Sequence, residues 1–242
     1  MHEQQLDDKA ARMLAIYEKQ RFNSARTSQT LRLRLVLWVL RVKVANSLKR
    51  ALDVAVAAVA LLLLSPLFAL TAVLIRLESP GPIFFQQVRL GKWGAPFYVY
   101  KFRSMYIDAE ARKAAIMAQN EADGPVFKMK NDPRITRVGK YIRKFSIDEL
   151  PQLVNVLKGE MSLVGPRPPV PKEVAEYEYD ELGRLNAVPG ITGLQQVSGR
   201  SDLDFKTWVE LDLQYIAEQS FWKDIEILFR TIPAGLLGKG AY

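Results

Sequence analysis

Two neighbouring carboxylates, Asp148 and Glu149, are the residues of this 242-residue chain best suited to carry chemistry. Their spacing also permits a purely structural use, because Ser146 and Glu149 match a capping box at the start of a helix running to about residue 157. That helix start would place Asp148 where the positive helix end favours an ionised carboxylate. An ionised carboxylate can attack phosphorus, and Glu149 can move a proton or help to hold a divalent cation against a diphosphate. The residues alone leave both uses open.

Three arginines in turn-rich settings accompany the pair: Arg143, Arg167 and Arg200. The planar fork of an arginine side chain suits phosphate oxygens, and prolines on both sides of Arg167 restrict its backbone. Surface ion pairs are the alternative use for each of them. The pattern favours a phosphate-bearing substrate, although the sequence contains neither a Walker loop nor a G-x-G-x-x-G motif.

Composition narrows the chemistry further. The chain contains no cysteine, which excludes disulfides and thiolate metal sites, and its single histidine is His2 at the terminus. Acid–base work therefore falls to Asp, Glu, Lys or Tyr side chains. Asp108 and Glu110 are expected to lie on a solvated helix face.

The elements that must position the pair include an uncharged run of 22 residues, 54–75, between Asp53 and Arg76. A hydrocarbon layer about 30 Å thick calls for roughly 20 apolar residues, so the run has the length of a membrane segment. Ser65-Pro66 at its midpoint predicts a kink, eased by a bond from the Ser65 hydroxyl to the Leu61 carbonyl. Basic residues flank both ends, which favours a re-entrant helix that enters and leaves on the same side; an ordinary single span is the alternative.

Positive charge is concentrated before this run. The net charge is +8, and residues 1–50 hold 11 Lys/Arg against four Asp/Glu. Such a block is attracted to anionic lipid by about 1 kcal/mol per basic residue; nucleic acid would attract it too, but would leave the apolar run unexplained. Residues 1–46 are therefore predicted to form a basic arm. Within it, the basic and apolar residues around Trp38 suit an interfacial helix, although residues 31–44 also alternate like a strand.

The remaining pattern predicts an α+β membrane-associated fold. A kinked re-entrant membrane helix (residues 47–78) would join a mostly helical cytoplasmic catalytic domain (residues 79–242) with a few short strands. Strands are expected at residues 83–90, 97–102 and 161–164, and Gly159 should close the helix that follows the carboxylate pair. Further helices are expected at residues 108–120, 173–186, 204–218 and 221–237.

Several segments together resemble a known family. They are KRALDVAVAAVALLLLSPLFAL, YKFRSM, FSIDELPQLVNVLKGEMSLVGPRPP, PGITGLQQVSGR and the terminal KGAY. Residues 47–242 are similar to the bacterial sugar transferases, the monotopic phosphoglycosyl transferases that start exopolysaccharide, O-antigen and glycoconjugate assembly. One departure is Gln195, where an aromatic residue is expected in many relatives; residues 145–147 vary more mildly.

The resemblance implies transfer of sugar 1-phosphate from a UDP-sugar to polyprenyl (undecaprenyl) phosphate, with release of UMP, at the cytoplasmic face of the bacterial inner membrane. Asp148 would be the nucleophile of a ping-pong cycle with a phosphosugar–aspartyl intermediate, and Glu149 its acid–base partner, both with Mg²⁺. The resemblance also implies substrate contacts by seven residues: Lys101, Arg103, Arg143, Arg167, Arg200, Asp212 and Tyr215. Ser65-Pro66 matches the kink of the family's membrane helix, with Arg50 and Asp53 at its mouth.

The expected partners are a UDP-sugar, polyprenyl phosphate and membrane lipid, with no nucleic acid; a second copy of the chain, as a homodimer, is a further candidate. A hexose such as galactose or glucose is favoured as the sugar. Two rival functions remain open. Asp202-Leu203-Asp204 resembles the metal-binding D-x-D motif of glycosyltransferases, which would release UDP, and a non-catalytic membrane scaffold would use Asp148 and Glu149 only as a cap.

Overall fold

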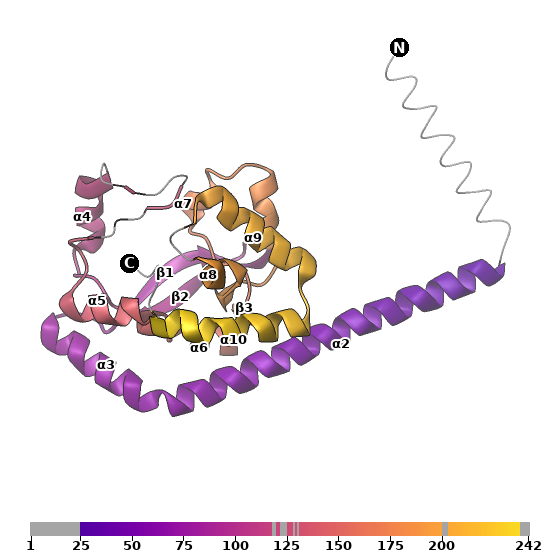
Figure 1. Cartoon of the computed structure of the whole chain (residues 1–242), viewed down its shortest axis with the longest axis horizontal. Coiled ribbons are helices and arrows are strands. Elements are labelled where there is room, and N and C mark those ends of the chain that lie inside the picture. The colour runs from indigo at the N-terminus through magenta and orange to yellow at the C-terminus, as the bar shows by residue number, and fades with distance from the viewer. Residues whose placement is uncertain are drawn as a thin grey trace, which may run out of the picture. The chain divides into compact units, whose positions relative to one another are not determined.

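The computed structural model describes residues 25–117, 120–121, 125–127, 129, 131–199 and 203–237 (Figure 1). The chain divides into two compact units, residues 1–48 and residues 49–242, which are described separately. Leu6, Ala10, Met13 and Tyr17 recur at helical spacing, which predicts a short surface helix, but this segment lies outside the described residues.

A bent pair of helices leads the described chain: α2, Ala25–Leu63, and α3, Ser65–Glu78. None of the described helices is both long and apolar enough to cross a membrane by itself, whereas Leu31–Leu63 and Ser65–Glu78 together reach that length and composition. The two are bent by 60°. Residues 31–44, whose conformation the sequence left open, are helical.

The bend occurs where the sequence predicts it, at Ser65-Pro66. Pro66 has no N–H to give to the Leu62 carbonyl, and the Ser65 hydroxyl donates to that carbonyl instead, at 2.8 Å. The predicted partner, Leu61, was therefore wrong by one residue. Backbone bonds from Leu64 to Ala60 and from Phe68 to Leu64 keep the chain ordered on both sides of the break. The kink thus has a local cause, the substitution of a side-chain donor for a missing amide.

The predicted hairpin is present as β1, Phe84–Leu90, antiparallel to β2, Pro96–Phe102, with the short 3₁₀ turn η1, Lys92–Gly94, between them. Val99 and Phe102 of β2 point into the core. The register pairs Phe85 with Lys101 and Arg89 with Phe97. The hairpin therefore presents two basic side chains, one from each strand.

A second, parallel pair joins β3, Ser162–Val164, to β4, Gly190–Thr192. Of these two strands, the sequence predicted only the first, at residues 161–164. A Cβ on Gly190 would lie 2.1 Å from the amide nitrogen of Gly165. The two backbones approach so closely that glycine is required, which explains why a turn-forming residue occurs within a strand.

The other helical elements surround these strands. They are α4 (Ala109–Ile116), α5 (Arg137–Lys144), η3 (Ile147–Glu149), α6 (Gln152–Lys158), α7 (Pro171–Val174), η4 (Asp180–Asn186), α8 (Leu194–Ser198), α9 (Phe205–Glu218) and α10 (Phe221–Leu237). Helix α10 has the predicted bounds, and Gly159 closes α6 with a φ of 84° as expected. The single helix expected over residues 173–186 is wrong. The chain turns at Tyr177, which packs against Phe205 and accepts a hydrogen bond from Arg184.

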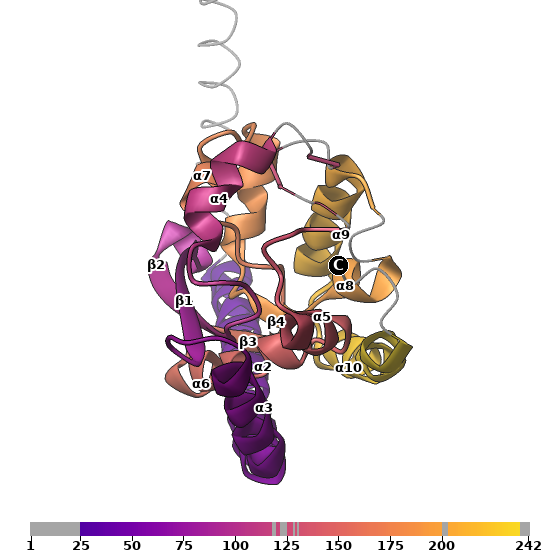
Figure 2. The same cartoon turned by 90° about the vertical axis from the view of Figure 1, so that its left-hand side faces the viewer.

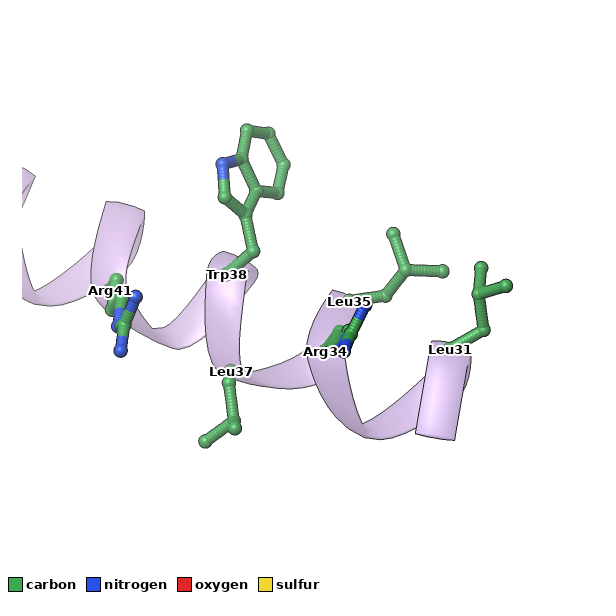
Figure 3. A pocket seen from close by; sticks show the side chains of 6 residues that line it. All are labelled: Leu31, Arg34, Leu35, Leu37, Trp38 and Arg41. Carbon is green, nitrogen blue, oxygen red and sulfur yellow. The ribbon is translucent and has the colours of Figure 1, made fainter. Parts of the chain in front are cut away.

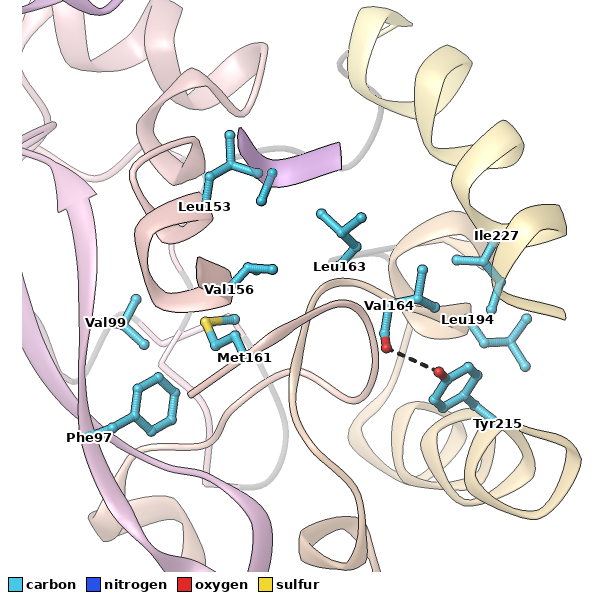
Figure 4. Packing of buried hydrophobic residues seen from close by; sticks show 11 residues of the cluster. Phe97, Val99, Leu153, Val156, Met161, Leu163, Val164, Leu194, Tyr215 and Ile227 are labelled. Carbon is cyan, nitrogen blue, oxygen red and sulfur yellow. Dashed lines mark hydrogen bonds between the residues drawn. The ribbon is translucent and has the colours of Figure 1, made fainter. Parts of the chain in front are cut away.

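Two apolar clusters fix the region that carries Asp148 and Glu149, which we call the dyad. The larger joins β2, α6, β3, α9, α10 and Ala57 of α2, and Figure 4 shows its side chains meeting from these separate segments. The smaller joins Ile75 of α3, Phe102 of β2 and Ile142 of α5. In both views α5, α6 and α10 lie on the side of the domain next to α3 and the end of α2 (Figures 1 and 2). The structure is thus a mostly helical α+β fold with short strands.

Candidate active site

Asp148 and Glu149 lie in η3, between α5 and α6. Ser146, just before them, adopts a left-handed conformation with φ 56° and forms no side-chain cap. Its backbone amide donates to the Arg143 carbonyl at 2.9 Å, and the Glu149 carboxylate binds Lys101 instead of closing the box. The predicted capping box is therefore wrong, and with it the simplest structural explanation of the pair. A left-handed serine is uncommon and concentrates at functional sites.

The side chain of Lys101 comes from β2 and forms an ion pair with Glu149, with 2.6 Å between Nζ and Oε1. Burial would raise the pKa of Glu149, but the positive charges of Lys101 and Arg167 outweigh it and lower that pKa to about 2. Glu149 is consequently ionised throughout the neutral range.

Asp148 behaves in the opposite way. It is only 6% exposed, and burial, with the negative charge of Glu149, raises its pKa to about 6, although Lys101 and Arg143 oppose the shift. The predicted stabilisation of its ionised form by a helix end is therefore outweighed by desolvation. Two adjacent carboxylates with separated pKa values are the usual arrangement of groups with different chemical roles.

Arg89, which the sequence analysis missed, is a further positive charge close to Glu149. It acts on the charge of Glu149, and its guanidinium donates to Gln87 Oε1 and, at 2.9 Å, to the Pro168 carbonyl. Burial and the charge of Arg167 lower the pKa of Arg89 to about 10. Arg89 thus fixes the segment after Arg167 against β1. Its signal was a charge at a strand position opposite the buried Phe97.

Arg167 lies over the ring of Trp208, 5.5 Å from its centroid, and Arg184 lies 5.3 Å from the same centroid. Arg184 forms a buried ion pair with Asp212 at 2.8 Å. Burial raises the pKa of Asp212 to about 6 against the effect of Arg184. Asp212 thus pairs with Arg184, and the guanidinium groups of Arg184 and Arg167 both lie against the ring of Trp208. The sequence analysis predicted Asp212 but missed Trp208, whose contacts come from distant segments.

Two other predicted residues contact the frame of the domain. The Tyr215 hydroxyl donates to the Val164 carbonyl at 3.0 Å (Figure 4) and to Asp224 at 2.7 Å. The guanidinium of Arg103 donates to the carbonyls of Ser79 and Pro80, at 2.7 and 2.8 Å. Direct substrate contacts by both remain predictions, and Arg200 lies outside the described residues.

The donor set near the pair limits how a metal could bind. Among the described residues, no group of three or more His, Cys, Asp or Glu side chains is placed to hold an ion. Mg²⁺ commonly binds one or two carboxylates and takes its other ligands from water and substrate phosphates. Asp148 and Glu149 therefore fit an Mg²⁺ ion shared with a diphosphate, which stays a prediction.

In the rival D-x-D motif, the carboxylate that the structure describes caps a helix. Asp204 is the N-cap of α9, and its Oδ1 accepts the Thr207 amide at 2.6 Å. This hydrogen bond lowers the pKa of Asp204. Asp202 lies outside the described residues. The carboxylate of Asp204 thus has a structural function that accounts for its presence.

A hollow on α2 is lined by Leu31, Arg34, Leu35, Leu37, Trp38 and Arg41 (Figure 3). All six residues come from one stretch of one helix, and Trp38 is 63% exposed. The lining offers apolar and cationic side chains without a carboxylate or a nucleophile. This hollow is therefore unsuited to the chemistry of the dyad.

Comparison with known proteins places these residues in context. Residues 44–238 match the family described as bacterial sugar transferase. The galactosyl transferase CpsE of Streptococcus agalactiae is 49% identical over 194 residues, which cover 80% of this chain and 43% of that protein.

Two other relatives are the exopolysaccharide production protein ExoY of Rhizobium meliloti and the UDP-glucose:undecaprenyl-phosphate glucose-1-phosphate transferase of Escherichia coli, each 43% identical. The matches cover 80% and 81% of this chain, and 88% and 41% of those proteins. The chain thus spans most of ExoY but less than half of the other two. Because the family match covers residues 44–238, well over half of the chain and including Asp148 and Glu149, the chain belongs to the bacterial sugar transferase family.

Proposed function

We propose that this protein transfers sugar 1-phosphate from a UDP-sugar to undecaprenyl phosphate, releasing UMP, as the first membrane step of exopolysaccharide or glycoconjugate assembly. The observation that carries the proposal is the pair Asp148 and Glu149, whose pKa values are separated in opposite directions beside a group of cations. The names of two relatives support it: one is a galactosyl transferase, and the other a UDP-glucose:undecaprenyl-phosphate glucose-1-phosphate transferase.

The reaction would proceed in two displacements at one phosphorus. The Asp148 carboxylate attacks the phosphorus next to the sugar, and the bond to the UMP oxygen breaks, so that UMP leaves with the electron pair. The lipid phosphate then attacks the same phosphorus, and the bond to Asp148 breaks to restore the carboxylate. Glu149, ionised in the free protein, can accept a proton at this step, although its low pKa makes it a weak base there.

The cations around the dyad supply the electrostatic part of the mechanism. Lys101 and Arg143 act on Asp148, and Arg167 and Arg89 act on Glu149. Phosphoryl transfer depends mainly on positioning and on neutralising charge at the phosphoryl oxygens. When bound with the diphosphate, Mg²⁺ would add to that neutralisation, with Asp148 and Glu149 as its protein ligands.

The reaction must take place at the membrane surface, because one substrate is lipid-linked and the other is water-soluble. The bent helix pair would hold the catalytic residues there. We place the bent pair in the cytoplasmic leaflet of the bacterial inner membrane as a re-entrant helix, with residues 79–242 on the cytoplasmic side. The basic arm of residues 1–46, with Trp38 among its arginines, suits the headgroup region. The bend at Ser65-Pro66 supports this topology.

Replacing the proline tests the topology. In Pro66→Leu the amide donor returns to the helix, and we expect the pair to straighten towards a full crossing. Because the chain has no cysteine, single cysteines at the exposed positions Asn46 and Leu77 can report sidedness without background. Both should react from the cytoplasm in the parent chain, and one should become periplasmic in Pro66→Leu. Two cytoplasmic flanks in the variant would contradict the expectation.

The nucleotide product tests the function itself. The purified full chain in lipid should release UMP when given a UDP-sugar and undecaprenyl phosphate, and a panel containing UDP-glucose and UDP-galactose should identify the hexose. Release of UDP would instead indicate the rival glycosyltransferase. Absence of turnover across the panel would favour a scaffold.

A further inference from the structure

The last residue of α3, Glu78, binds the beginning of α5. Its Oε1 and Oε2 accept the backbone amides of Arg137 and Val138 at 2.6 and 2.9 Å, and these are the first two residues of α5. A helix start leaves its first amides without partners within the helix, and a negative charge there is stabilising. Glu78 thus joins the end of the bent pair to the start of a helix 59 residues later.

The other helix of the bent pair, α2, makes the complementary contact. Arg50 of α2 donates through Nη1 to the Val156 carbonyl and through Nη2 to the Leu157 carbonyl, the latter at 2.9 Å. These carbonyls belong to the last turn of α6, where a positive charge is stabilising. One turn along α2, Asp53 accepts the Leu163 amide of β3 at 3.0 Å.

The dyad lies in the chain between these two contacts. Glu78 holds the beginning of α5, Arg50 holds the end of α6, and Asp148 and Glu149 occupy η3 between the two helices. The apolar contacts follow the same division. Ile147, beside Asp148, packs on the cluster that contains Ile75 of α3, whereas Ala57 of α2 joins the cluster that contains Val156. Helix α3 therefore contacts the α5 side of the segment that carries the dyad, and α2 contacts its α6 side.

We propose that Arg50 and Glu78 are positioning residues for Asp148, through which the bent helix pair fixes the dyad relative to Lys101 and Arg143. The inference rests on the proposed function for its kinetic consequence. Neither side chain has a described contact with Asp148 or Glu149, so the effect passes through α5 and α6. Displacements of about 1 Å at a reacting group can cost a hundredfold in rate.

The test compares Glu78→Ala, Arg50→Ala and the conservative variants Glu78→Asp and Arg50→Lys in the full chain reconstituted in lipid. Glu181→Ala is the matched control, because Glu181 also accepts a backbone amide, that of Glu178 at 2.8 Å, but outside the dyad segment. We expect the alanine variants to lower kcat for UMP release about tenfold or more, with KM for the UDP-sugar changed less than twofold. Glu78→Asp and Arg50→Lys should recover part of kcat, and Glu181→Ala should resemble the parent.

A second readout does not depend on turnover. Amide hydrogen exchange over residues 145–152 should become at least about tenfold faster in both alanine variants and stay unchanged in Glu181→Ala. Unchanged exchange there, or a rise in KM without a fall in kcat, would overturn the proposal. If an alanine variant does not fold, the same comparison applies to the conservative variants. If the parent turns over no UDP-sugar, the proposed function fails while the exchange data still decide whether the two helices of the bent pair fix the dyad.

Discussion

Asp148→Asn should abolish UMP release, with a loss of about a thousandfold or more, because the carboxamide lacks the anionic oxygen that attacks phosphorus. Incubation with the UDP-sugar alone should leave the parent chain heavier by one phosphosugar at position 148. The variant should keep its unmodified mass. Intact-mass measurement and peptide mapping would check both outcomes.

The fold should survive this substitution. Asp148 is buried, and burial raises its pKa to about 6, so the protein gains little from its charge and an amide of the same shape fits the site. Asp204→Asn is the matched control. Asparagine caps helices about as well as aspartate, so α9 should persist, and activity should persist unless the rival D-x-D motif is the true site. A parent enzyme that turns over without ever acquiring mass would refute the covalent mechanism.

The rate of the first displacement should fall on acidification below about pH 6. The pKa of Asp148 is raised to about 6, and only its ionised form is nucleophilic, so the active fraction grows as pH rises through that value. Below it, the rate should drop about tenfold per pH unit. The measurement is the burst of UMP from the UDP-sugar alone, which excludes titration of the lipid phosphate. A rate independent of pH from 5 to 7 would contradict the assignment.

Two substitutions should move the acid limb of the pH profile, that is, the pH below which the rate falls, in opposite directions. Lys101→Met removes a charge that lowers the pKa of Asp148, so the limb should move to higher pH, with a rate loss of about a hundredfold. Glu149→Gln removes a charge that raises the same pKa, so the limb should move to lower pH. Lys158→Met is the control, because this exposed lysine binds the Tyr100 hydroxyl and not the dyad. Shifts in the same direction would show that another group titrates.

Elements governed by local rules could be predicted from the sequence. The bend follows from Pro66, which lacks an amide, and the closure of α6 follows from Gly159, which adopts a positive φ. Helix α10 and the hairpin followed from their apolar patterns. In each case the deciding residues lie within a few positions of one another.

The errors arose where a distant segment decides. Glu149 matched a capping box in sequence, but its partner is Lys101, which β2 brings from 48 residues away. The break at Tyr177 depends on Phe205, and the support of Arg167 depends on Trp208. Such contacts leave no periodic signal, so much of the surroundings of Asp148 and Glu149 could not be predicted from the sequence.

The hydroxyl of Ser65 has a consequence for where the bend can reside. Hydrocarbon offers no solvent to satisfy an open carbonyl, so a kinked backbone is tolerated there only when its polar groups find partners within the protein. By donating to Leu62, Ser65 supplies such a partner at the vertex itself. The bend can therefore lie in an apolar environment without leaving the Leu62 carbonyl unsatisfied.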